Sequence, residues 1–197
     1  MTSSLVEFDR RFLSEYRLIG GTDEAGRGPL AGPVACAAVI MPLDTADIVD
    51  GVDDSKKVSE KKRETLYESI IDKALSYSIR FVEHDEIDLI NILNATKKGM
   101  LDCHDALYLR PDVLLIDAVK LDIKNCVSII KGDAKSYNIA CASILAKVAR
   151  DRLMRKYDEI YPGYGFCRHK GYGTAEHYAA IREIGLCPIH RKSFAIR

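Results

Sequence analysis

The chain has 197 residues, a length that fits one domain, and 47% of them are hydrophobic, enough for a sizeable core. Its net charge is zero, and a charged fraction of 29% is ordinary for a globular protein. No apolar run approaches the roughly 18–20 residues of a membrane span, and the first residues lack the order of a secretory signal. We therefore expect a cytoplasmic protein that does not bind a membrane.

The sheet is expected to begin with a hairpin. Residues 16–22 predict a first strand. Residues 34–41 (VACAAVIM) are continuously apolar and end at Pro42, which predicts a second, buried strand. The glycines and prolines between them favour a turn over the start of a helix.

The middle of the chain predicts two helices around a third strand. Ser59 can cap a helix that begins at Glu60. Residues 77–82 (YSIRFV) alternate enough to predict a strand. Residues 85–108 have apolar residues on one side and predict a single helix.

The second half predicts strands separated by helices. We expect a strand that ends near Asp117, a strand at 127–130, a long helix within 132–157, a loop at 161–173 and a last helix from its Thr174 cap to Ile184. Three consecutive strands followed by strands that alternate with helices predict an α/β fold with a five-stranded mixed sheet and helices on its faces.

Carboxylates occur where apolar strands end. Asp23 and Glu24 end the first, Asp117 ends the fourth, and Asp133 follows the fifth at the start of the long helix. Ligand sites in α/β sheets gather at such strand ends and helix starts. Two alternatives are that Asp133 only caps its helix and that Glu24 lies on the surface.

Four carboxylates in one place resist joint ionisation, and a divalent cation removes that conflict. Oxygen ligands favour Mg²⁺ or Mn²⁺ over zinc. Two such ions can activate a water and stabilise the leaving oxygen of a phosphodiester. The acids therefore predict a metal site that accepts phosphate.

Glycines directly follow the first two acids. The segment 26–31 (GRGPLA) fits the loose GxGxxA pattern of dinucleotide-binding folds, but a strand follows it instead of the required helix. Glycine does allow the backbone to approach a ligand closely, and Arg27 can add a phosphate contact.

Six scattered cysteines contain no CxxC pair, so we expect reduced, mostly packed thiols. Cysteines and histidines between 167 and 190 match no usual zinc spacing.

Charge is uneven along the chain: residues 1–130 carry 16 basic and 23 acidic side chains, and residues 131–197 carry 13 and 6. Both a solvated surface and a basic face for a polyanion fit this balance.

The sequence resembles the bacterial type 2 ribonucleases H, the ribonuclease HII family. The resemblance covers nearly the whole chain in family order. Its blocks are DEAGRGP at 23–29, DSKK at 54–57, ID at 116–117, GDAK at 132–135, ASILAKV at 142–148, RD at 150–151 and HKGYGT at 169–174.

The resemblance implies one RNase H-like catalytic domain, residues 1–197, whose last ~35 residues form a helical and loop extension that contributes to substrate binding. It implies that the four acids bind the catalytic metals, Mg²⁺ or Mn²⁺. The backbone of Gly26, Arg27 and Gly28 would read the ribose 2′-OH, and Tyr172 would pack on the sugar of the next deoxynucleotide. Candidate phosphate contacts are Lys56, Lys57, Lys147, Lys170 and Arg191, although a solvated surface is the alternative for each lysine.

The implied activity is that of an endoribonuclease that hydrolyses RNA in RNA–DNA hybrids. It would also incise duplex DNA on the 5′ side of single ribonucleotides and leave 3′-OH and 5′-phosphate ends. We expect a monomer. Two alternatives remain: a DNA nuclease or resolvase of the same fold, and a noncatalytic module that binds hybrids.

Overall fold

The computed structural model describes residues 4–53 and 58–195. Five strands form one mixed sheet in the order β3-β2-β1-β4-β5, so the predicted architecture is confirmed. Neighbours β1, β2 and β3 are antiparallel, and β1, β4 and β5 are parallel. The strands are β1 Ile19–Ala25, β2 Val34–Ile40, β3 Ser76–Val82, β4 Val113–Asp117 and β5 Cys126–Ile129.

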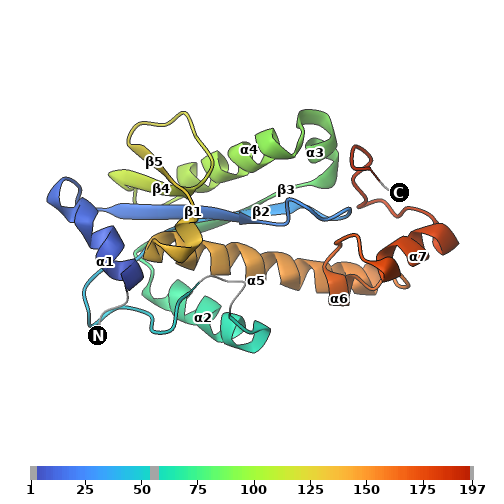
Figure 1. Cartoon of the computed structure of the whole chain (residues 1–197), viewed down its shortest axis with the longest axis horizontal. Coiled ribbons are helices and arrows are strands. Elements are labelled where there is room, and N and C mark those ends of the chain that lie inside the picture. Colours follow the sequence, from blue (N-terminus) through green and yellow to red (C-terminus); the bar gives the residue numbers. More distant parts are fainter. Residues whose placement is uncertain (1–3, 54–57, 196–197) are drawn as a thin grey trace.

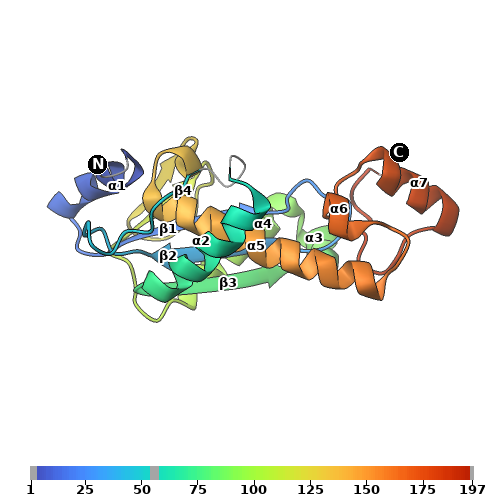
Figure 2. The ribbon, with the colours of Figure 1, turned by 90° about the horizontal axis from the view of Figure 1, so that it is seen from below.

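Helices cover both faces of the sheet (Figure 1). Helices α3 and α4 lie on one face, and α2 and α5 lie on the other. Figure 2 shows α6 and α7 at the end of the molecule opposite α1. The α-helices are α1 Ser4–Arg10, α2 Glu60–Lys73, α3 His84–Ile90, α4 Ile92–Asp105, α5 Tyr137–Ile160, α6 Phe166–His169 and α7 Ala175–Ile184, and the 3-10 helices are η1 Arg11–Ser14 and η2 Gly132–Ala134.

The contact between β1 and α5 organises the core. Gly21 lies so close to the helix that a Cβ atom there would be 2.3 Å from the carbonyl carbon of Asn138. All seven residues of β2 are buried beside this contact. Ser136 caps α5 by accepting a hydrogen bond from the amide of Ile139. The helix that carries part of the site is therefore fixed against the central strand.

Strand β1 begins and ends three residues later than expected. Its antiparallel pairing with β2 continues to Ala25 opposite Ala35. Asp23 and Glu24 are therefore inside the strand, where successive side chains point to opposite faces. The expectation that the strand ends before these two acids is wrong, because the hairpin ladder extends past them.

The helices also differ from expectation in four places. The helix expected over 85–108 is two helices, because Asn91 adopts a φ of 66° and caps the second helix through the amide of Asn94. The long helix begins after Ser136, so Asp133 is not its cap. The expected loop at 161–173 contains the short helix α6, and α1 was not predicted.

The two expected helix caps are confirmed. Ser59 caps α2, and Thr174 caps α7. All six cysteines are free thiols, and four of them are buried. Within the described residues, no helix combines the length and the apolar character that crossing a bilayer requires.

The C-terminal segment returns to the loop that follows β1. Ala31 and His190 form an antiparallel bridge, and the amide of Gly32 donates to the carbonyl of Ile189. The amide of Leu30 donates to the carbonyl of Gly171. Loop 26–33 is thus enclosed by chain from the last 30 residues.

Candidate active site

Four carboxylates line one cavity of about 240 Å³ at the end of the sheet where parallel strands β1 and β4 finish. Asp23 and Glu24 come from β1, Asp117 is the last residue of β4, and Asp133 lies in η2. The structure therefore brings together all four acids that the sequence singled out. Because the cavity lies at the end of β1, side chains from both faces of that strand reach it.

Asp23 has the smallest exposed fraction of the four acids. Burial raises the pKa of its carboxyl well above the usual range, and the charge of Glu24 raises it further. A hydrogen bond with Ser143 opposes these effects, and the charge of Asp117 adds to them. The site thus disfavours a full set of negative charges unless a cation is present.

Asp117 and Asp133 are placed by the turn between β5 and α5. The amide of Gly132 donates to Oδ1 of Asp117 over 2.7 Å. A Cβ atom at Gly132 would lie 2.6 Å from Cδ1 of Ile139 and 3.3 Å from Cα of Asp117. Only glycine permits this close approach of the η2 turn to the end of β4.

The donor set fits a hard divalent cation. In the described part of the chain, no three acidic, histidine or cysteine side chains stand gathered as a ready-made group for one ion. The four carboxylates nevertheless face a common cavity, and their oxygens are the donors that Mg²⁺ and Mn²⁺ prefer. A cation among them would relieve the like-charge conflict that raises the pKa of Asp23.

The glycine-rich loop and Tyr172 also line the cavity. Gly26, Arg27 and Gly28 line it together with Tyr172, whose exposed fraction is 44%. A Cβ atom built on Gly28 would lie 3.5 Å from Cε1 of Tyr172, so the ring is directly beside the loop. Arg27 also contacts Glu24, with 3.5 Å between Nη1 and Oε1.

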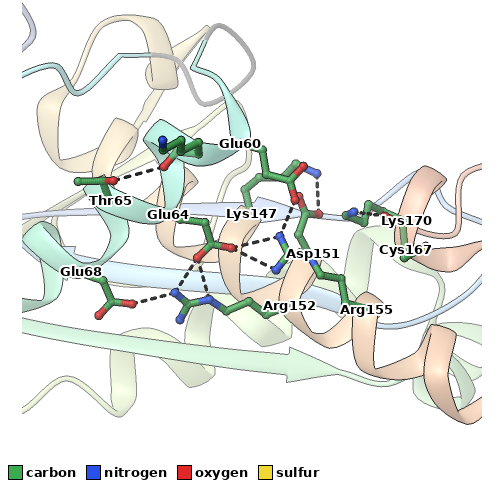
Figure 3. Close-up of polar contacts among 11 residues, drawn as sticks. Glu60, Glu64, Thr65, Glu68, Lys147, Asp151, Arg152, Arg155, Cys167 and Lys170 are labelled. Carbon is green, nitrogen blue, oxygen red and sulfur yellow. Dashed lines mark hydrogen bonds and ion pairs between the residues drawn. The ribbon is translucent and has the colours of Figure 1, made fainter.

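The basic candidates have different surroundings. Lys147 lines the cavity, its Nζ is 2.7 Å from Oδ1 of Asp151, and burial lowers its pKa (Figure 3). Lys170 is buried and donates to the carbonyl of Cys167 in the same view. Lys56 and Lys57 lie outside the described residues.

Arg191 does not lie on the surface, where a phosphate contact was expected. Its exposed fraction is 0%, and its guanidinium donates to the carbonyls of Gly26, Arg27 and Gly32. The expectation was wrong because the sequence shows the charge of an arginine but not the loop that folds over it.

Two polar residues of the cavity were missed from the sequence. Ser143 and Arg150 line it with Lys147, all three from α5. Their spacing of i, i+4 and i+7 is that of one helix face. This spacing, next to a carboxylate-rich strand end, was the signal available in the sequence.

The histidines behind the cavity form a chain of hydrogen bonds. His190 Nδ1 accepts from the amide of Cys187, and its Nε2 lies 3.1 Å from Nε2 of His177. His177 Nδ1 lies 3.0 Å from the carbonyl of Tyr172. With neutral rings, His190 donates to His177, and His177 donates to Tyr172. The chain therefore fixes the backbone of Tyr172.

Comparison with known proteins gives consistent matches over most of the chain. The family model described as Ribonuclease HII matches residues 20–197. The ribonuclease HII of Acetivibrio thermocellus is 58% identical over 181 residues, covering 91% of this chain and 70% of that protein. The ribonuclease HII of Caldicellulosiruptor saccharolyticus is 53% identical over 191 residues, covering 95% of this chain and 92% of that protein.

The fold also matches a solved structure. The crystal structure of ribonuclease H2 from Pyrococcus horikoshii OT3 superposes with a TM-score of 0.78 at 26% sequence identity. The alignment covers 91% of this chain and 95% of that one. The sheet and its flanking helices are therefore those of the RNase H fold.

Proposed function

The chain belongs to the ribonuclease HII family, and we propose that the carboxylate-lined cavity is where it cuts its substrate. As a type 2 ribonuclease H, it is a metal-dependent endonuclease that acts on RNA–DNA hybrids. Family membership thus favours the endonuclease over a DNA nuclease of the same fold and over a noncatalytic hybrid-binding module. The same cavity would incise duplex DNA on the 5′ side of a single ribonucleotide and leave 3′-OH and 5′-phosphate ends.

The observation that carries this proposal is that one cavity is lined by four carboxylates, a glycine-rich loop and an exposed tyrosine. The carboxylates would hold Mg²⁺ or Mn²⁺. When bound, such ions supply an activated water and stabilise charge at the scissile phosphate. Ser143 keeps Asp23 oriented through its hydrogen bond, and the amide of Gly132 does the same for Asp117.

The loop and the tyrosine would select the cleavage position. The 2′-OH distinguishes a ribonucleotide from its DNA neighbours. The backbone of Gly26, Arg27 and Gly28 can approach that hydroxyl because Gly26 and Gly28 have no side chain on the cavity wall. Tyr172 lies beside Gly28 and offers an apolar ring face to the next sugar. Among the lysines that the structure describes, Lys147 lines the cavity and is in position to contact a phosphate.

The last ~35 residues would contribute to substrate binding within one catalytic domain spanning 1–197. Tyr172 belongs to this extension. The β-bridge between His190 of the extension and Ala31 supports the role, because it holds the extension against the glycine-rich loop. We also propose that the protein is a monomer, because one chain is sufficient to supply the four carboxylates, the glycine-rich loop and the tyrosine of the cavity. A cytoplasmic location fits a bacterial enzyme that acts on DNA-containing duplexes.

A cleavage assay tests the proposed site. Duplex DNA with one ribonucleotide should be cut only when Mg²⁺ or Mn²⁺ is added, and mapping should place the cut on the 5′ side of the ribonucleotide. Asp117→Asn should lower the rate by about a hundredfold or more, because metal stabilisation of the transition state amounts to several kcal/mol. Asparagine can still accept from the amide of Gly132, so the melting temperature should change little.

Asp112→Asn is the matched control. Oδ2 of Asp112 also accepts from backbone amides, those of Arg17 and Leu18, but at the start of β4, away from the cavity. This variant should keep wild-type activity. Near-normal cleavage by Asp117→Asn would remove Asp117 from the proposed site.

A further inference from the structure

Two arginines are buried beneath loop 26–33 and bind its backbone. Arg150 and Arg191 have exposed fractions of 1% and 0%. Among the described residues, every hydrogen bond from their guanidinium groups goes to a main-chain carbonyl, and neither forms an ion pair. Burial lowers the pKa of Arg150 to about 10 and that of Arg191 to about 9, values at which both stay charged near neutral pH. Two buried charges that lack an ion pair are costly to keep and so require a reason.

Arg191 binds carbonyls from both ends of the loop. Its Nη2 is 2.6 Å from the carbonyl oxygen of Gly26, its Nη1 is 2.8 Å from that of Arg27, and its Nε is 2.9 Å from that of Gly32. The ring of Phe194 supports the guanidinium from one side, 4.9 Å from Cζ. Three carbonyls of one loop therefore converge on one planar group.

Arg150 binds the far end of the loop and joins it to the segment that carries Tyr172. Its guanidinium donates to the carbonyls of Pro33, Ala31 and Lys170 over 2.9, 3.1 and 2.9 Å. A Cβ atom at Gly26, where φ is 95°, would lie 1.9 Å from Nε of Arg150. The guanidinium of Arg150 thus occupies the space where a side chain at position 26 would lie. The loop can pack on Arg150 in this way only when residue 26 is glycine.

The direction of the carbonyls determines the direction of the neighbouring amides. In a planar trans peptide, the C=O and the N–H of the next residue point in opposite directions. Because the carbonyls of Gly26 and Arg27 point toward Arg191, the N–H groups of Arg27 and Gly28 point to the opposite side of the loop. Both residues line the cavity. A cation on the carbonyl side also polarises these peptides and makes their N–H groups better donors.

We propose that Arg191 and Arg150 are positioning residues that hold the amides of Arg27 and Gly28 oriented toward the ribose 2′-OH before substrate binds. This inference rests on the proposed function, because it assumes that loop 26–28 reads the ribonucleotide. Discrimination between RNA and DNA then depends on two buried side chains whose guanidinium hydrogen bonds go to the backbone of the protein itself. Preorganisation of this kind lowers the cost of ordering the loop on binding.

The test replaces the guanidinium group of Arg191 by an ammonium group, which carries the same charge. Lysine cannot hold three carbonyls in one plane, so Arg191→Lys keeps the charge and loses the geometry. The readout is the ratio of Kd for an all-DNA duplex to Kd for the same duplex with one ribonucleotide, measured without divalent ions. This ratio does not depend on the folded fraction. We expect it to fall at least fivefold in Arg191→Lys, while Kd for the all-DNA duplex changes less than twofold.

Arg10→Lys is the matched control. Arg10 also donates to a main-chain carbonyl through two nitrogens, over 3.0 and 2.6 Å to Leu43, but it lies on α1 at the opposite end of the molecule (Figure 1). The Kd ratio of Arg10→Lys should equal that of the wild type. An unchanged ratio in Arg191→Lys, or a wild-type ratio near one in an enzyme that cuts normally, would overturn the inference. Failure of the wild type to cut at all would instead contradict the proposed function.

Two further measurements apply if Arg191→Lys does not fold. Arg150→Lys should lower the same ratio by at least fivefold, and an unchanged ratio would contradict the proposal. In the wild type, the amides of Leu30 and Gly32 should exchange slowly with solvent before any duplex is added, because they are bonded to Gly171 and Ile189 in the free protein. Rapid exchange that becomes slow only on addition of duplex would show that the loop is not preorganised.

Discussion

Gly26 and Gly28 belong to the same loop, but a methyl group would meet different atoms at the two positions. At Gly26 it would overlap the side chain of Arg150, and the backbone there has a positive φ. At Gly28 it would make an ordinary contact with Tyr172, and the backbone conformation is open to any residue. The fold therefore requires glycine at position 26 but leaves room for a methyl group at position 28.

We predict that Gly28→Ala separates stability from activity. Its free energy of unfolding should stay within about 1 kcal/mol of the wild type, because alanine fits and lowers the entropy of the unfolded chain. The value of kcat/KM on a single-ribonucleotide duplex should fall about tenfold or more, because the methyl group occupies the space proposed for the sugar. Urea unfolding and steady-state cleavage measure the two quantities. Wild-type kcat/KM in this variant would show that no substrate group passes close to Gly28.

At the level of elements, the sequence predicted what depends on local signals. The apolar run of β2, the Ser59 and Thr174 caps, and the placement of Asp117 at a strand end are local features, and the structure has them. The break at Asn91 was missed because it depends on one residue with a positive φ. Asparagine tolerates this conformation, but the presence of an asparagine in a sequence does not predict it.

The environment of Arg191 could not be predicted for a different reason. Its partners Gly26 and Gly32 are 165 and 159 residues away in the chain, so no local pattern relates them. An arginine is far more common on surfaces than in cores, and a phosphate contact was the natural expectation. The four acids were found because each follows an apolar run, whereas the arginine is defined only by the folded loop.

The helices α6 and α7 are joined by neutral histidines, which predicts a pH dependence. Burial, together with the neighbouring His169 and His190, lowers the pKa of His177 to about 4, although the hydrogen bond to the carbonyl of Tyr172 raises it. The unfolded chain therefore binds a proton between about pH 6.5 and 4 that the folded chain does not, so stability from this group is present above pH 6.5 and is lost toward pH 4. The loss should be on the order of 3 kcal/mol.

Urea unfolding at several pH values between 7 and 4.5 measures this effect. His177→Asn can still donate to the carbonyl of Tyr172 but cannot be protonated, so its stability should fall less steeply with decreasing pH than that of the wild type. His104→Asn changes a histidine at the end of α4, far from this cluster, and should keep the wild-type slope. Identical slopes in the wild type and His177→Asn would contradict a buried, neutral His177.

Across the whole molecule, charge separates along the chain. Residues 131–197 carry 13 basic and 6 acidic side chains, while residues 1–130 carry 16 and 23. The basic part includes all of α5 and the extension with Tyr172, and the acidic part supplies three of the four cavity carboxylates. This distribution suits a duplex backbone that lies against the extension while one phosphate enters the acidic cavity.

Affinity for an all-DNA duplex should therefore depend on salt. With roughly three phosphates neutralised, log K should fall with log salt at a slope of about −3, or roughly 60-fold between 50 and 200 mM. Lys147→Gln should reduce the slope by about one. Lys124→Gln, which removes a charge before β5 at the other end of the strands, should leave it unchanged. Binding that is independent of salt would exclude a backbone-binding face.

The most direct measurement is anomalous diffraction from crystals of the protein soaked in Mn²⁺. Manganese should appear inside the cavity bounded by Asp23, Glu24, Asp117 and Asp133, and the signal should be lost or weakened in Asp117→Asn crystals. Manganese bound only elsewhere, in a protein that cuts ribonucleotide-containing duplexes in the same buffer, would contradict the assignment of these four carboxylates as the metal site.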